Sequence, residues 1–318
     1  MSDASDAREA AAEARSPDGR LRARAHRRDA QRPRLTRDPG GETDPLPRLE
    51  REMTDHFQRT PEPHDEDRML VALALLALND ASGAALALSG MSTPDGADLP
   101  AALAAGAWAA WRGEMLPLAL LRDAGMRWLA AVPASLPAAD DDWSRCALAF
   151  GPAAAEACDD PRLLERLRAR PGTGLPPLER LALTRCRVAP AAASAGEVLR
   201  LMHGTLGVVP DAPRGRVRLG PDVATGSWTL EHLALGDATL SLRVEAREVG
   251  SVAITVDQTA GAMPLTAILE PRVPARRLRQ VEVDGRPATL DARQDGDGLR
   301  VSVQLVIDQP RSLTIDFE

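Results

Sequence analysis

The sequence predicts an α+β protein: an α-helical hairpin domain followed by an antiparallel β-sandwich domain, with a disordered N-terminal arm. Three observations lead to this prediction. Residues 1–65 contain almost no large apolar side chains. Apolar residues then recur at helical spacing, and from Arg216 onward they alternate with polar residues. We therefore expect an Arg-rich arm over residues 1–65, a helical hairpin domain over residues 66–208 and a β-sandwich over residues 214–318.

The expected arm is rich in Arg, Asp, Ala and Pro, and so few apolar groups cannot offset the entropy lost on folding. Between Arg20 and Arg37, eight arginines stand against a single acid, Asp29. Such a basic run can contact nucleic acid or an acidic partner of unknown identity, and the alternative is a solvated tail or an upstream extension that is not natively translated. The net charge of the chain is −7, which gives no overall attraction to nucleic acid.

Several classes of protein are disfavoured by the sequence. The N-terminus has no apolar run typical of a secretory signal, and the apolar run from Met69 to Leu78 is too short to span a bilayer. Cys146, Cys158 and Cys186 have no metal-binding spacing, and no glycine-rich phosphate loop is present. We expect reduced thiols in a cytoplasmic protein with no metal, no cofactor and no membrane contact.

Two helices joined by a tight glycine turn are predicted in the middle of the helical part. Leu103 and Trp111 fall on one face of a helix that begins after Asp98 and ends at Gly113. A partner helix over Met115–Val132 would complete an αα-hairpin. Further helices are expected over residues 69–78, 143–157, 162–170 and 178–188.

The last helix and the first strand are predicted to lie close together. Ser194 and Glu197 match a capping box, so we expect a helix to begin at Ser194 and to end at Gly207. The first strand follows within a few residues, and short connections keep consecutive elements adjacent. The two domains should therefore share an extensive apolar interface.

The β part is predicted from period-two segments separated by turn residues. Asp284-Gly285 indicates a type I′ hairpin turn, because both of its central residues tolerate a positive φ. Gly236-Asp237 and Asp297-Gly298 are expected turns as well. About nine short strands of this kind indicate a sandwich. They are expected over residues 216–219, 228–235, 238–246, 252–257, 265–271, 279–284, 288–292, 300–307 and 312–317.

The stretch Leu201–Glu245 resembles the junction between the helical toroid and the β region of six-hairpin glycosidases, especially the amylo-α-1,6-glucosidase (glycogen debranching) type. The segment Trp108–Glu114 is similar to a hairpin turn of the same toroid. The residues that carry the junction resemblance are Leu206-Gly207-Val208, Pro210-Asp211-Ala212-Pro213, Gly215, Leu219, Pro221, Trp228 and Leu235-Gly236-Asp237-Ala238.

The resemblance implies glycoside hydrolysis, which needs two carboxyl groups facing each other across a sugar. Glu114, Asp140 and Asp142 are the catalytic candidates, and Trp143 and Trp111 are candidate sugar platforms. Each has a simpler alternative. Glu114 can be a helix-terminus carboxylate, the acidic run a solvated loop, and the tryptophans core residues of the hairpins.

The length of the helical part argues against a complete toroid. About twelve helices need roughly 350 residues at usual helix and loop lengths, and roughly 140 are present. The resemblance therefore implies a shortened relative. We expect a carbohydrate-associated protein with weak or absent hydrolytic activity. The alternative is a non-catalytic structural or interaction protein in which the sandwich packs on the helical hairpins.

Overall fold

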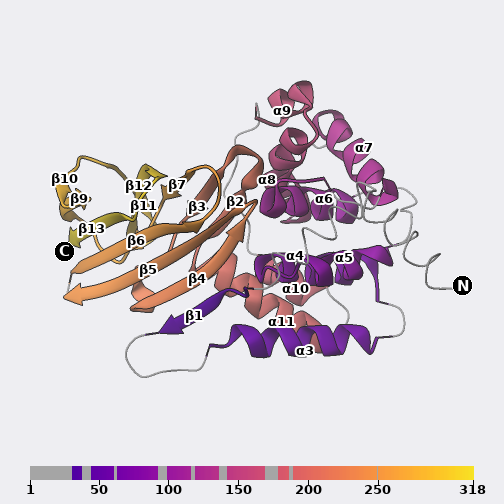
Figure 1. Ribbon diagram of the computed structural model, residues 1–318, viewed down its shortest axis with the longest axis horizontal. Helices are drawn as coiled ribbons and strands as arrows, with labels where there is room; N and C mark the ends of the chain where they lie inside the picture. The colour runs from indigo at the N-terminus through magenta and orange to yellow at the C-terminus, as the bar shows by residue number, and fades with distance from the viewer. Residues whose placement is uncertain are drawn as a thin grey trace, which may run out of the picture.

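The α+β class is confirmed by the computed structural model, in which helices form one side of the molecule and β-sheets the other (Figure 1). The two parts meet along a broad contact rather than through a linker. The structure describes residues 31–37, 44–60, 63–91, 99–115, 119–135, 142–168, 178–185, 189–248 and 250–318.

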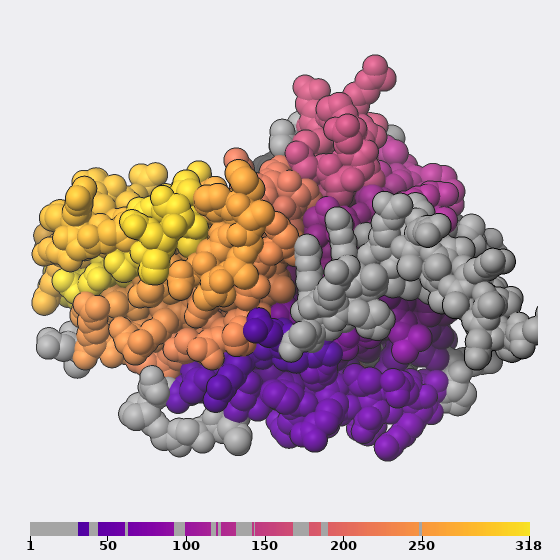
Figure 2. All heavy atoms as spheres, in the orientation of Figure 1, coloured from indigo at the N-terminus to yellow at the C-terminus, as the bar shows by residue number. Residues whose placement is uncertain are grey.

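The N-terminal part contains a strand and a helix, which corrects the prediction of a disordered arm over residues 1–65. Strand β1 (Arg34–Arg37) pairs antiparallel with β4 (Trp228–Leu235). In Figure 2 the indigo atoms of this segment lie directly beside the orange atoms of the β part. Helix α3 (Leu46–Gln58) packs against α11 (Ala189–Leu199).

The reason for this correction lies in the spacing of a few residues. Leu46, Leu49 and Met53 are the buried residues of α3, and they recur at i, i+3 and i+7. One apolar stripe is enough to bury a helix face, even where the overall composition is polar. Arg20, Asp29 and the rest of the first thirty residues lie outside the described part of the chain.

Helices α4, α7 and α8 pack around α6, whose residues 101–112 are all buried. Small residues make this packing possible. A Cβ on Gly106 would lie 2.9 Å from Phe150 of α8, and a Cβ on Gly125 of α7 would lie 2.9 Å from the Ala101 carbonyl of α6. The predicted αα-hairpin is thus formed by α6 and α7. The helices are α4 (Asp65–Ala77), α5 (Ala81–Ser89), α6 (Leu99–Arg112), α7 (Ala119–Ser135), α8 (Asp142–Ala157), α9 (Pro161–Arg168), α10 (Leu178–Arg185), α11 and the π-helical η1 (Arg200–Thr205).

The predicted capping box at Ser194 is wrong. Ser194 lies inside α11, and its hydroxyl donates to the Glu52 carboxylate at 3.3 Å, which ties α11 to α3. Glu197 pairs with Arg200 instead of reaching back to the helix start. The Ser194 side chain therefore bonds to α3, and it does not cap the start of a helix as the local motif predicts.

The β part consists of two sheets with buried residues alternating along most strands. Pairing is antiparallel except between β3 and β7, which run parallel. The seven-stranded sheet has the order β1-β4-β5-β6-β13-β9-β10, and the six-stranded sheet contains β11-β12-β7-β3-β2, with β8 on β12. The strands not yet given are β2 (Val208–Asp211), β3 (Arg216–Leu219), β5 (Ala238–Glu248), β6 (Ser251–Ala260), β7 (Leu265–Leu269), β8 (Arg272–Val273), β9 (Leu278–Val283), β10 (Arg286–Pro287), β11 (Asp291–Asp295), β12 (Gly298–Ile307) and β13 (Arg311–Phe317).

The predicted turns are largely confirmed. Asp284 and Gly285 have φ angles of 51° and 71°, as a type I′ turn requires. A turn also follows β4 at Gly236-Asp237. The third turn is shifted by one residue to Gly296-Asp297, because Gly296 takes the positive φ of 65°. The expected strand over residues 288–292 instead begins at Asp291.

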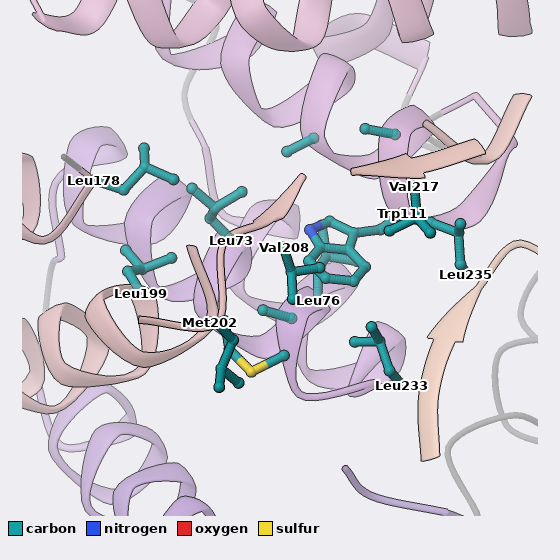
Figure 3. Close-up of a cluster of buried hydrophobic side chains, with 14 of the residues drawn as sticks. Leu73, Leu76, Trp111, Leu178, Leu199, Met202, Val208, Val217, Leu233 and Leu235 are labelled. Atoms are coloured by element: carbon teal, nitrogen blue, oxygen red, sulfur yellow. The ribbon is translucent and has the colours of Figure 1, made fainter. Parts of the chain in front are cut away.

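The predicted apolar interface between the helical and β parts is confirmed. Trp111, Met202, Val208 and Leu235 point toward one another from α6, η1, β2 and β4 (Figure 3). One cluster of buried side chains runs through both parts without interruption. Its residues are contributed by helices and sheets together, so neither part encloses this core alone.

Asn79 forms side-chain hydrogen bonds across this interface. It is 3% exposed and has a φ of 62° just after α4. Its side-chain amide donates to the carbonyls of Gln31, at 2.9 Å, and His232, at 2.5 Å, and it accepts from the Ala234 amide at 3.1 Å. His232 lies at an irregularity in β4, with a positive φ of 61°. A single side chain thus joins α4, the N-terminal segment and the first sheet.

Candidate functional site

A pocket of about 600 Å³ lies where the last helices meet the second sheet. Helix α10, the π-helical turn η1 and strands β2, β3, β11 and β12 supply its walls. We call it the junction pocket. It is lined by Leu178, Glu179, Leu199, Arg200, His203, Gly204, Gly207, Val209, Arg218, Gly220, Glu270, Arg293, Gln294, Asp295 and Arg300.

Guanidinium and carboxylate groups alternate along the sheet side of the pocket. Arg218 of β3 pairs with Glu270 at 3.3 Å. Arg300 of β12 donates from Nε to Asp295 at 2.8 Å and pairs with it a second time at 2.6 Å. Arg300 also donates to the Glu270 carbonyl at 3.0 Å. These contacts hold planar hydrogen-bonding groups in fixed orientations.

The helix side of the pocket carries a third ion pair. Arg200 and Glu197, one turn apart, form two hydrogen bonds, the Nε bond being 2.8 Å long. The hydrogen bond from Arg200 lowers the pKa of Glu197, and the same bond raises the pKa of the Arg200 guanidinium. Both groups therefore stay charged at neutral pH, and Arg200 presents a permanent donor.

Two glycines of the pocket let neighbouring backbone segments approach closely. Gly207 has a φ of 62°, and a Cβ on it would lie 2.3 Å from the Gly220 carbonyl oxygen. A Cβ on Gly220 would lie 3.1 Å from the Arg300 guanidinium. The amide of Gly220 donates to the Gly207 carbonyl at 3.0 Å. The close approach of these two backbones needs residues without side chains.

His203 is the most unusual polar group of this pocket. Its Nδ1–H donates to the Val208 carbonyl at 2.6 Å, so Nε2 is unprotonated and carries a lone pair. The residue is partly exposed, but Nε2 itself is buried and has no hydrogen-bond partner among the described residues. The rings of Trp111 and Phe150 lie edge-on at 5.9 and 6.4 Å. Burial lowers the pKa of His203 to about 4, against a smaller opposing effect of its hydrogen bond. His203 is therefore neutral at pH 7.

The carboxylates predicted as catalytic do not line the junction pocket. Asp142 begins α8 and pairs with Arg145 at 3.4 Å and with Arg180 of α10 at 3.5 Å. Glu114 lies just beyond the end of α6 and is partly exposed. Asp140 lies outside the described residues. Asp142 thus connects two helices, as a structural carboxylate would.

Of the predicted tryptophan platforms, Trp111 is likewise not at the pocket surface. Trp111 is only 1% exposed and belongs to the hydrophobic core, which agrees with the simpler alternative for hairpin tryptophans. A ring buried to this degree cannot stack on a sugar from solvent. Trp143 is part of α8, but its side chain lies outside the described part of the structure.

The Pro-Asp-Ala-Pro segment of the junction forms a second polar cluster. Arg214 pairs with Asp211 at 3.1 Å and with Glu156 of α8 at 3.5 Å. Burial raises the pKa of Asp211, although Arg214 opposes this effect. The cluster fastens the short 3-10 helix η2 (Ala212–Arg214) to α8. The segment that carries the sequence resemblance therefore has a packing role.

Sequence reasoning missed the pocket residues because they come from seven separate elements. Arg293 and Arg300 face each other across β11 and β12, but their registers are set only by the fold. The signal available was the density of arginine and acid between Glu270 and Arg300, which alternates in sign. Alternating charges on strands are usual on exposed faces, and this pattern alone does not indicate a pocket.

The free cysteines include one buried and one half-buried thiol. Cys146 is buried in the helical core, and Cys158 lies just after α8. Burial raises the pKa of the Cys158 thiol to about 11, so this thiol is protonated at neutral pH. Cys186 lies outside the described residues. In the described part of the chain, no three His, Cys, Asp or Glu side chains are grouped to hold a metal ion.

Comparisons with known proteins find similarity to solved structures only. No protein-family model matches the chain, and no curated protein matches it. The chain is similar to a GH127 β-L-arabinofuranosidase from Geobacillus stearothermophilus T6, with 14% identity over 69% of this chain and 41% of that one, and a TM-score of 0.26. A second GH127 β-arabinofuranosidase has 12% identity, coverage of 68% and 42%, and a TM-score of 0.26. The chain spans about two-fifths of the length of these structures.

No helix in the described ranges is both long and apolar enough to cross a membrane.

Proposed function

We propose that this protein binds carbohydrate in the junction pocket and has weak or absent hydrolytic activity. The observation that carries the proposal is the composition of the pocket walls. Fixed guanidinium donors stand beside carboxylate acceptors in these walls. Sugar hydroxyls donate and accept hydrogen bonds, so a surface that offers both in rigid positions suits them.

The same walls argue against efficient glycoside hydrolysis. A general acid must hold a proton at neutral pH, usually through burial or a neighbouring carboxylate. Glu270 and Asp295 are instead each held in an ion pair with an arginine. Without proton donation to the leaving oxygen, the rate should fall by roughly a hundredfold or more.

The test is binding of the purified chain to a panel of neutral and acidic oligosaccharides, followed by calorimetric titration of those that bind. Arg218→Gln should weaken binding at least tenfold, because it removes a fixed donor from the pocket wall. Arg216→Gln is the matched control, since Arg216 is exposed on the same strand but does not line the pocket. Unchanged affinity in the Arg218 variant would mean that the oligosaccharide binds outside the junction pocket. No binding to any oligosaccharide would overturn the proposal.

Hydrolysis is tested separately with maltose and branched dextrins. We expect no turnover above the rate of a buffer blank. Clear release of glucose that is abolished by Asp142→Asn would show that the predicted acidic loop, and not the junction pocket, carries an activity. The binding and hydrolysis assays thus test the two halves of the proposal independently.

A further inference from the structure

Three sulfur atoms converge outside the junction pocket, beside helices α6, α7 and α8. The Sγ of Cys158 is in contact with the Sδ of Met115 and lies 3.5 Å from the Sδ of Met126. Met115 follows the end of α6, Met126 is on α7, and Cys158 follows α8. Figure 1 shows these three helices side by side. The close packing of α7 and α8 on α6 brings the sulfur atoms together.

We infer that Cys158, Met115 and Met126 form a binding site for a soft monovalent metal ion, Cu(I) or Ag(I). Thiolate and thioether groups are the ligands that such ions prefer, whereas Mg²⁺ and Ca²⁺ need oxygen ligands. The three residues are all partly buried, so the site is sheltered yet within reach of solvent. None of them lines the junction pocket, and the inference does not depend on the proposed function.

The charges of the site suit a monovalent ion. When Cu(I) binds, an S–Cu bond replaces the S–H bond of Cys158, and the displaced proton passes to solvent. No electron is transferred in this step. The thiolate and the ion then form a neutral unit, which a partly apolar site accepts more readily than an isolated charge. Arg122 and Asp160 are the charged groups that act on the thiol, and their effects oppose each other.

The two methionines give the site its selectivity. Their side chains are flexible and their thioethers uncharged, so they can adjust to a metal ion without adding charge. An ordinary cysteine on the surface would bind the same ion through one sulfur. The difference between one ligand and three is what the experiment must measure.

The experiment is an anaerobic competition for Cu(I) supplied as its coloured bicinchoninate complex. The protein carries Cys186→Ser so that only Cys146 and Cys158 remain as thiols. We expect one equivalent of Cu(I) to leave the complex, and Cys158→Ser to abolish this uptake. Met115→Leu and Met126→Leu should each weaken uptake at least tenfold. These variants conserve side-chain volume and should keep the fold, which circular dichroism will verify.

Met263→Leu is the matched control, because this methionine is 73% exposed and distant in sequence from the site. Its affinity for Cu(I) should equal that of the parent protein. No uptake of Cu(I), or uptake that survives Cys158→Ser, would overturn the inference. Uptake that needs Cys158 but is unaffected in both folded methionine variants would overturn it as well, since the site would then be a simple thiol.

Discussion

Acidification should destabilise this protein in part through His203. In the folded chain the imidazole is neutral, because its Nε2 is buried without a partner and its pKa is about 4. In the unfolded chain the pKa of a histidine is about 6.5. Between these two values the unfolded state binds more protons than the folded state. The free energy of unfolding must therefore fall as the pH decreases from about 6.5 toward about 4.

The magnitude follows from these two pKa values. Each tenfold difference in proton affinity corresponds to about 1.4 kcal/mol, so the full effect is about 3 kcal/mol. About 2 kcal/mol should be lost by pH 5, and nothing should be lost from this source above pH 7. The lowered pKa values of Glu52 and Glu197 also cost stability at low pH, whereas the raised pKa of Asp211 acts in the opposite direction. A direct comparison with a His203 variant separates these contributions.

The assay is urea denaturation followed by tryptophan fluorescence at pH 7, 6, 5 and 4. His203→Asn is the variant, because its side-chain amide can still donate to the Val208 carbonyl but does not titrate. The difference in free energy of unfolding between wild type and variant should shift by about 2 kcal/mol from pH 7 to pH 5, to the disadvantage of the wild type. Parallel pH profiles for the two proteins would refute the reasoning, and would mean that the imidazolium finds a solvated position in the pocket.

Three further predictions concern the fold. Asn79→Gly keeps the positive φ but removes three hydrogen bonds, and urea denaturation should show a loss of about 2–4 kcal/mol; a loss below about 1 kcal/mol would mean that water replaces the amide. Gly207→Ala should cost about 3 kcal/mol or more, since its Cβ would lie 2.3 Å from a backbone oxygen. Gly285→Ala, whose Cβ meets nothing within 4 Å, should lower the free energy of unfolding by only about 1–2 kcal/mol. Equal losses for the two alanine variants would mean that the steric contact at Gly207 adds nothing to the cost of the positive φ. Leu49→Ala should lower the free energy of unfolding by about 2–4 kcal/mol in calorimetry, while deletion of residues 1–30 should change it little. A negligible cost at Leu49 would mean that α3 does not pack on the protein, as the prediction of a disordered arm had it.

The sequence by itself determined the class of the fold and most of its elements. The change of apolar period near residue 208 separates helices from strands because 3.6 and 2 residues per repeat are properties of the backbone. The turn at Asp284-Gly285 could be predicted for the same reason, since the φ angles of a type I′ turn restrict the residues that can form it. Gly113, with a φ of 70°, likewise ends α6 where it was expected. These signals are local, and distant residues do not alter them.

Only the tertiary structure decided which side chains lie in the core and which meet in a pocket. The stripe of α3 becomes buried because α11 covers it, and Trp111 is core because the β part closes over α6. Arg218, Asp295 and Arg300 come together through the registers of separate strands, which depend on the packing of whole sheets. Burial and proximity are properties of pairs of distant residues. The spacing of residues along the chain therefore cannot supply them, and the site became visible only in the folded molecule.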